Sequence, residues 1–435
     1  MSKIEVNTVE PQCGTTLTLG ASGDTVTLGS GASQSGFGRT GAVDWQTTKK
    51  TASFTAVNGE GYFVDTTSSA LTVTLPSSPS AGDIVAIVDY AGTAPTNNIT
   101  IGRNSSNING DASDLTITRA NGGITLVYVD ATEGWKNTET SNINDITLVP
   151  EYVTATGGTV TTNGDFKVHT FTGPGTFCIS SAGNAAGSNT VDYLVVAGGA
   201  GGGGNVAGGG GAGGHRSNFP SSNSGLTVCA QAYPITVGSG GTGGTVDSAQ
   251  GGDGNNSVFS TITSAGGGGG GTHAGTKDGR DGGSGGGGAA HDCTPRAGGS
   301  GNTPPVSPPQ GNDGGDGGLG NPVGYAAGGG GGAGAAGTAG SPPGAGPGGN
   351  GTANSINGTP TTRAGGGGGG AGATGTIGSG GSGGGGAGGK FPSNPAATAG
   401  TVNTGGGGGG GDSGSSAGDG GNGGSGIVII TYKFQ

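Results

Sequence analysis

The chain has 435 residues, of which 115 are glycine, and its formal net charge is −11 at pH 7. Average proteins contain about 7% glycine, so this composition excludes an ordinary core built from side chains. Only 29% of the residues are hydrophobic and 9% are charged, and the absence of clustered lysine and arginine argues against nucleic acid as a partner.

Residues 1–44 form the first segment, which contains a short internal repeat. Residues 16–20 and 25–29 both alternate threonine with leucine or valine, and a Ser-Gly-Asp turn lies between them. This alternation predicts two half-buried strands. Because a two-stranded unit buries too little surface to be stable by itself, we predict that the chain forms a homotrimer in which these segments wind together.

Features of export and of membrane insertion are missing from the sequence. The N-terminal residues contain no apolar stretch of the signal-peptide type, and no segment reaches transmembrane length. We therefore expect assembly in a cytoplasm and no membrane insertion. The cysteines at positions 13, 178, 229 and 293 are too few and too far apart for a disulfide framework, so we expect reduced thiols.

Residues 45–140 have the composition of a small β domain. The strand candidates are residues 62–64, 71–75, 84–88, 99–101, 115–117 and 124–129. Turn sequences rich in glycine, asparagine and aspartate separate them. Short strands with regular punctuation predict a small antiparallel sandwich or barrel.

The order of motifs in this β domain carries a resemblance. A strand followed by a proline turn, then Gly82-Asp83, Asn97-Asn98 and a closing Gly134-Trp135, resembles a module of tail fibres, tailspikes and head fibres of bacterial viruses, including those of marine cyanobacteria. The resemblance spans about residues 62–135. It implies a virion structural protein, usually trimeric, in which residues 1–44 would attach to other virion proteins.

Residues 141–196 form a β connector that ends in an apolar strand. Strands are expected at residues 145–149 and 167–171, and residues 191–197 are strongly apolar just before the glycine runs begin. Residues 427–435 contain a second apolar strand after the last run. We predict that the two apolar strands meet at the base of the glycine-rich domain and close it.

Residues 197–426 consist of glycine runs of about seven to ten residues, separated by polar segments with regular spacing. Ordered glycine must recover its large conformational entropy through backbone hydrogen bonds. A left-handed helix of the polyproline-II type directs its N–H and C=O groups outward, where they can pair with neighbouring helices. We therefore predict an all-β N-terminal half followed by a bundle of polyglycine-II helices, with essentially no α-helix.

The glycine runs and the closing Gly-Ser-Gly-Ile-Val-Ile-Ile sequence also resemble the polyglycine-sandwich domain of tail-tip adhesins in T-even-like phages. The resemblance covers about residues 191–435. It implies that loops at the distal end of the bundle contact the host receptor, a surface glycan or an outer-membrane protein.

Large side chains within the glycine-rich domain are confined to the segments between runs. Rings and charges are the usual anchors of recognition surfaces, so these side chains are the candidates for receptor contact. They are His215, Arg216, Phe219, His273, Lys277, Arg280, His291, Tyr325, Lys390 and Phe391.

Catalytic and cofactor chemistry finds no support in the sequence. Glycine-rich strings that resemble nucleotide fingerprints arise by chance at this composition, and none precedes a Lys-Ser or Lys-Thr pair. His291-Asp292-Cys293 places three ligand types in a row, but adjacent residues seldom converge on one ion. We therefore predict no enzyme activity, no cofactor, no metal and no catalytic residues.

The combined reading is a virion protein, a trimeric tail fibre or adhesin that binds the host through loops of its C-terminal domain. An alternative is a capsid-attached head fibre or decoration protein. A free glycine-rich protein, such as an ice-binding one, is a third possibility, against which the polar loops and the N-terminal module count.

Overall fold

The computed structural model describes residues 43–140, 146–220, 225–245, 249–273, 278–291, 294, 296–320, 324–391, 396–412 and 418–435. The repeat at residues 16–29, on which the trimer prediction rests, lies outside these ranges. The described residues form strands and extended segments without an α-helix, as predicted, and none of their segments is a helix that could span a membrane. Contacts divide the chain into two compact units, Met1–Thr147 and Leu148–Gln435.

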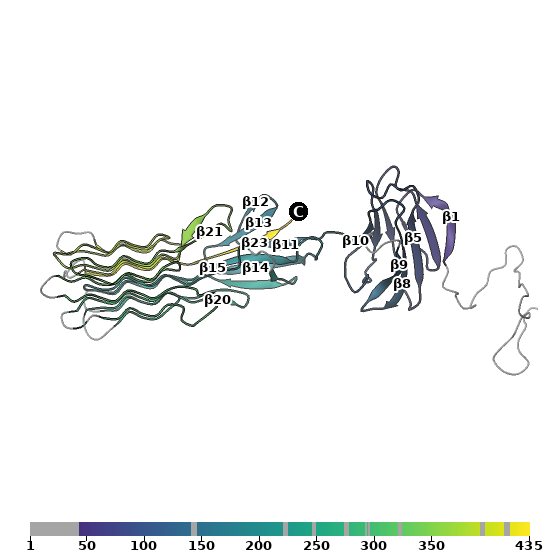
Figure 1. Ribbon diagram of the computed structural model, residues 1–435. Helices are drawn as coiled ribbons and strands as arrows, with labels where there is room; N and C mark the ends of the chain where they lie inside the picture. The colour runs from purple at the N-terminus through teal and green to yellow at the C-terminus, as the bar shows by residue number, and fades with distance from the viewer. Residues whose placement is uncertain are drawn as a thin grey trace, which may run out of the picture. The chain divides into compact units, whose positions relative to one another are not determined.

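The first unit contains two sheets of five strands each (Figure 1). In spatial order, one sheet consists of β1 (Asp44–Lys50), β3 (Glu60–Val64), β5 (Ile84–Asp89), β8 (Gly123–Asp130) and β9 (Gly134–Thr140). The other consists of β10 (Ile146–Leu148), β7 (Leu115–Ile117), β6 (Ile99–Gly102), β4 (Leu71–Thr74) and β2 (Phe54–Thr55).

The strand pairing in this unit is mixed, which differs from the antiparallel pairing that the turn spacing predicts. Strand β3 pairs in parallel with β1 and β5, and β4 pairs in parallel with β2 and β6. The chain crosses from one sheet to the other after each of the strands β1 to β5. Each of the strands β1 to β4 therefore pairs in parallel with the strand two places later in the sequence. Antiparallel pairs begin where β7 follows β6 in the same sheet and β8 pairs with β5.

Alternation of side chains places the core of the first unit between its sheets. In β4, Leu71 and Val73 are buried, whereas the intervening Thr72 is only half-buried. The same period-two pattern buries Ile99 and Ile101 of β6. Trp135, at the start of β9, is the largest side chain that is completely buried.

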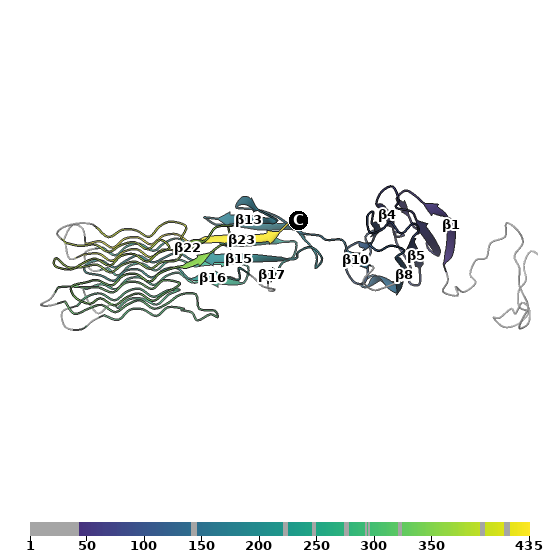
Figure 2. The same cartoon turned by 45° about the horizontal axis from the view of Figure 1, so that its top comes forward.

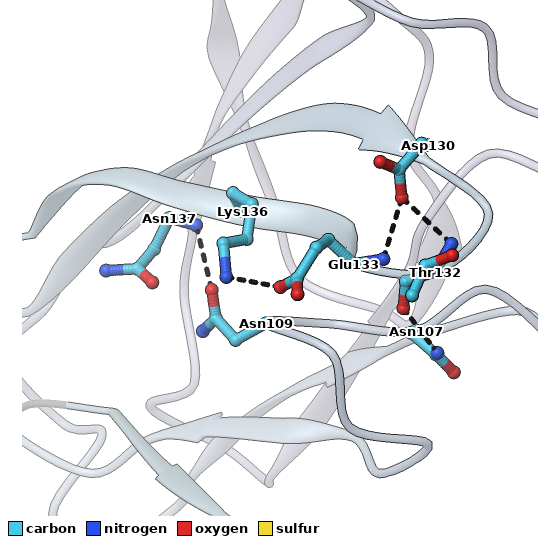
Figure 3. A network of polar contacts seen from close by, with 7 residues as sticks. All are labelled: Asn107, Asn109, Asp130, Thr132, Glu133, Lys136 and Asn137. Carbon is cyan, nitrogen blue, oxygen red and sulfur yellow. Dashed lines mark hydrogen bonds and ion pairs between the residues drawn. The ribbon is translucent and has the colours of Figure 1, made fainter.

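A network of polar contacts holds the turn between β8 and β9 (Figure 3), and this turn explains why glycine precedes that tryptophan. The Asp130 carboxylate accepts hydrogen bonds from the N–H groups of Thr132 and Glu133, both at 2.8 Å. Asn107 donates to the Thr132 carbonyl oxygen at 2.8 Å, and its own carbonyl accepts from the Trp135 N–H at 2.9 Å. Gly134 has a φ of +69°, and a Cβ at this position would overlap the Asn107 carbonyl oxygen.

Gly134→Ala is therefore expected to destabilise the first unit by at least about 3 kcal/mol, because it adds a steric overlap to an unfavourable left-handed backbone. Gly82→Ala is the matched control. Gly82 also has a positive φ, +92°, but a Cβ there would meet nothing within 4 Å. We expect that substitution to cost about 1 kcal/mol. Chemical denaturation of the two variants measures the difference, and equal losses would contradict the close approach at Gly134.

The second unit contains two sheets whose strands lie before, between and after the glycine runs in the sequence. One sheet consists of β11 (Val153–Thr156), β14 (Gly175–Ala182), β18 (Ala232–Thr236), β19 (Ser257–Phe259) and β20 (Ile262–Ser264). The other consists of β12 (Thr159–Asn163), β13 (Phe166–Phe171), β23 (Ile427–Lys433), β15 (Thr190–Val196) and β16 (His215–Ser217), with β17 (Leu226–Thr227) also paired to β15. A separate hairpin joins β21 (Thr352–Asn354) and β22 (Thr361–Arg363).

The predicted pairing of the two apolar strands is confirmed. Strands β15 and β23 are antiparallel neighbours, with Val196 opposite Ile427 and Asp192 opposite Thr431. Strand β23 is apolar on both faces because both are covered. Val428 and Ile430 pack in the cluster between the sheets, whereas Ile427 and Ile429 pack in a second cluster that includes Ala364 at the start of a glycine run.

Beyond the sheets, the glycine runs form a bundle of polyglycine-II helices (Figure 2). The run of residues 197–204 shows the threefold pattern. The N–H groups of Gly198, Gly201 and Gly204 donate to the carbonyl oxygens of residues 255, 252 and 249. Those of Gly199 and Gly202 donate to another run, at residues 424 and 421, and those of Ala200 and Gly203 donate to a third, at residues 211 and 208. Each direction therefore recurs every three residues, as in this helix type.

The run of residues 207–214 lies inside the bundle. Its N–H groups donate to the runs at residues 405–411, 265–271 and 328–331. Its carbonyl groups accept from different runs, at residues 197–203, 284–287 and 367–370. A Cβ at Gly208 or Gly210 would overlap a carbonyl oxygen of a neighbouring run. The core of the bundle is thus made of backbone, and it requires glycine.

Candidate functional site

Most of the candidate binding side chains lie at the two ends of the bundle, because its interior is formed by the backbone of glycine and alanine. We call the end remote from the sheets the tip, defined by Val206, His273, His291, Tyr325 and the pair Lys390 and Phe391. Backbone contacts join these residues across the runs. Ala290 N–H donates to the Val206 carbonyl, His291 is bridged to Leu319, and Ala371 is bridged to both Ala326 and Lys390.

Three predicted residues form one aromatic cluster at the tip. The His273 ring lies 5.3 Å from the His291 ring and 5.4 Å from the Tyr325 ring, the latter in an edge-to-face arrangement. His273 Nδ1 is 2.8 Å from the Ala290 carbonyl oxygen, which fixes the ring. The Tyr325 ring lies over Gly320, where a Cβ would overlap it. All three side chains are half-buried.

The remaining tip residues offer more accessible surface. Phe391 is 42% exposed, and Leu319, which is bridged to His291, is 47% exposed. Lys390, next to Phe391, is half-buried. Exposed apolar side chains beside a cation are typical of a recognition surface. Leu319 was not a candidate from the sequence, although it too stands beside a glycine run.

Two other predicted residues do not belong to the described tip. Arg280 is exposed on the flank of the bundle, where its guanidinium Nη1 lies 3.1 Å from Asp253 Oδ2 and its other nitrogens contact Gln250. Its backbone N–H pairs with Gly269, which is in the middle of a run. Lys277 lies outside the described residues, as do Asp292 and Cys293 of the His-Asp-Cys sequence.

His215, Arg216 and Phe219 lie at the opposite end of the bundle, beside the sheets. Strand β16 brings His215 and Arg216 to the edge of β15, with Arg216 opposite Val195, and Phe219 follows shortly after the strand. They line a cavity of about 310 Å³, which we call the base groove, together with Tyr193, Pro308 and Asn354. Apart from Arg280 on the flank, the described candidate residues therefore lie at two opposite ends of the bundle.

Hydrogen bonds hold the walls of the base groove in place. The Ser217 hydroxyl accepts from Phe219 N–H at 3.0 Å and from Asn354 Nδ2 at 3.1 Å, and it donates to the Tyr193 carbonyl at 2.9 Å. Arg216 Nη1 donates to the Thr263 carbonyl oxygen at 3.1 Å. Phe219 also packs against the second apolar cluster, so it is a partly structural residue rather than a free loop side chain.

Burial sets the protonation of the groove histidine. Removal from water lowers the pKa of His215 to about 4, and the positive charge of nearby Arg363 acts in the same direction. Burial likewise lowers the pKa of His169, which lies within the sheets next to Tyr432. Both histidines are therefore neutral in the folded protein at pH 7.

These lowered values predict that the second unit loses stability on mild acidification. Below pH 6.5 the unfolded chain binds protons that the folded state excludes, so unfolding becomes easier as the pH falls from 6.5 towards 4. For His215 the loss is up to about 1.4 kcal/mol per pH unit. Urea unfolding at pH 7 and pH 5 measures it, and His215→Gln should flatten the difference. An unchanged slope in that variant would contradict the buried, neutral state of His215.

Metal-ligating side chains do not gather at one point in the part of the chain that the structure describes. No group of three histidine, cysteine, aspartate or glutamate side chains there could hold a metal ion. The described cysteines, Cys178 and Cys229, are free and exposed.

The comparison with protein families agrees with the bundle. The profile of a family described as a glycine-rich domain matches residues 172–433, which begins in the sheets and ends in β23. A comparison with curated proteins found no match.

Proposed function

The chain belongs to the family of glycine-rich domains, and from this premise we propose that it is a structural protein of a bacteriophage particle, a tail fibre or adhesin that binds the host surface through the tip of its bundle. The observation that supports the proposal is that the backbone bundle and the candidate binding side chains at the tip are separate parts of the domain. The scaffold consists of hydrogen-bonded backbone, whereas the tip carries the His273 cluster and the exposed Phe391.

This arrangement suits adhesion for a physical reason. The described side chains at the tip lie outside the backbone core, so their identities can change while the bundle stays intact. A single tip offers few anchors, and its affinity would be modest. Several copies on one particle would convert modest contacts into firm attachment, because the second contact becomes intramolecular.

The proposal includes a homotrimer, and the bundle limits where its contacts can form. The hydrogen bonds of the described runs join segments of the same chain, so the proposal assigns association to the N-terminal segment. Association would then depend on residues 1–44. Sedimentation of the full chain tests this: a trimer is expected, and a monomer at micromolar concentration would contradict it.

Labelling of whole particles tests the proposed location. An antibody raised against residues 191–435 should bind at the end of the tail in electron micrographs, and the purified chain should compete with particles for host cells. Label on the capsid would favour a head fibre or decoration protein instead. Particles without label would exclude both virion locations.

A further inference from the structure

The base groove has features of a ligand site that the proposed role of the tip does not use. Its volume of about 310 Å³ is at the lower end of the range for small-molecule sites. Its lining includes the cation Arg216 but no aspartate or glutamate, in a chain whose net charge is −11. The groove is thus locally positive within an acidic protein.

Arg363 strengthens this positive character. Its side chain is only 6% exposed, and Nη1 has no hydrogen-bond partner within the described part of the chain. Strand pairing sets Arg363 opposite Thr352, which lines the groove. His215 Nε2, also in the groove, is buried and likewise unpartnered among the described residues. Buried charges in proteins are normally paired, so an acceptor at this point would complete the site.

The walls of the groove indicate what could carry that acceptor. Phe219 supplies aromatic surface, and Asn354 supplies an amide whose position is fixed by Ser217. The Tyr193 ring itself packs on Phe259 in the cluster between the sheets. Aromatic surface with a few fixed polar groups is the usual composition of sites for small polar organic molecules. Arginine, with its forked donors, recognises carboxylates and related oxyanions in two-point contacts.

We propose that the base groove binds an acidic sugar, with the carboxylate or sulfate group held by Arg216 and directed towards Arg363, and the ring against Phe219. The lining fits an anion because it offers one cation, Arg216, and hydrogen-bond donors without a competing carboxylate. This site is separate from the tip, so its occupancy does not depend on host contact there.

Calorimetric titration of the full chain tests the chemistry with defined probes: glucuronate, glucose 6-sulfate, glucose and inorganic sulfate. The two acidic sugars should bind, and glucose should bind at least about tenfold more weakly, since it lacks the charged contact. Glucose that binds as tightly as glucuronate would overturn the anion requirement. Inorganic sulfate that binds as tightly as glucose 6-sulfate would overturn the role of the sugar ring.

Variants locate the binding in the groove. Arg216→Gln should weaken glucuronate binding about tenfold or more. Arg280→Gln is the matched control, because Arg280 is an exposed arginine on the flank of the bundle, and it should leave the affinity unchanged. Equal affinities of Arg216→Gln and the parent chain would overturn the proposal.

Arg363→Met supplies a second measurement that does not depend on Arg216. Replacing a buried guanidinium whose Nη1 lacks a partner among the described residues by an apolar side chain of similar length should leave the melting temperature in ligand-free buffer unchanged or raise it. The increase in melting temperature that glucuronate causes in the parent chain should shrink in the variant. A variant that melts earlier without ligand and keeps the full increase would contradict the anion-binding role of Arg363.

Discussion

Gly368→Val is expected to lower the melting temperature of the second unit far more than Ala353→Val does. Gly368 N–H donates to the Gly386 carbonyl at 2.8 Å, and its carbonyl accepts from Gly410 at 2.9 Å. A Cβ at this position would overlap the Gly378 carbonyl oxygen. The valine must push a neighbouring run aside and break its hydrogen bonds, which should cost at least about 3 kcal/mol.

Ala353 is the control because it is exposed in β21, and strands accept valine well. Calorimetry of the full chain compares the two variants. The transition of the first unit serves as an internal reference, since both substitutions lie in the second unit. Equal melting temperatures of the two variants would contradict a tightly packed backbone core.

The sequence predicts the bundle well because the physical requirement is unusually specific. Glycine over seven or more positions can be ordered only by backbone pairing, and the apolar strands at residues 191–197 and 427–434 have no other place to be buried. Among the strands that the sequence pattern missed are β1 and β9 of the first unit. Their sequences, DWQTTKK and GWKNTET, are mostly polar because both strands lie at the edges of their sheet.

The division of the candidate residues between tip and base could not be read from local sequence. His215 and Lys390 each follow a glycine run directly, yet the first lies at the base and the second at the tip. The end that a residue reaches depends on the number of reversals before it. The number of reversals cannot be obtained by counting glycine runs, because the chain also turns within the bundle, for example at the bend of residues 282–284.

The sequence does not identify Arg363 as a candidate, for a different reason. A single arginine before a glycine run gives no sign of whether it is solvated or buried. Only the pairing of β21 with β22, which sets it beside the base groove, shows that its charge is enclosed. Burial of this kind depends on contacts between distant segments, and composition does not report them.

Replacing Lys390 and Phe391 together with alanine should strongly reduce adsorption to host cells and leave the melting temperature and oligomeric state unchanged. Phe391 is 42% exposed, so its removal takes little from the core. Loss of a ring and a charge at the centre of a contact typically costs about 2 kcal/mol or more. Because many copies act together on one particle, this loss would become a large change in the number of retained particles.

Arg216→Ala is the comparison for this experiment, since it removes a cation at the opposite end of the bundle and leaves Phe219 in its packing. Adsorption of particles that carry each variant measures the effect, and we expect it to fall only for the tip variant. A loss confined to Arg216→Ala would move host contact to the base groove. If both variants adsorb as well as the parent, neither end binds the host through these side chains, and attachment to the capsid becomes the better account of the protein.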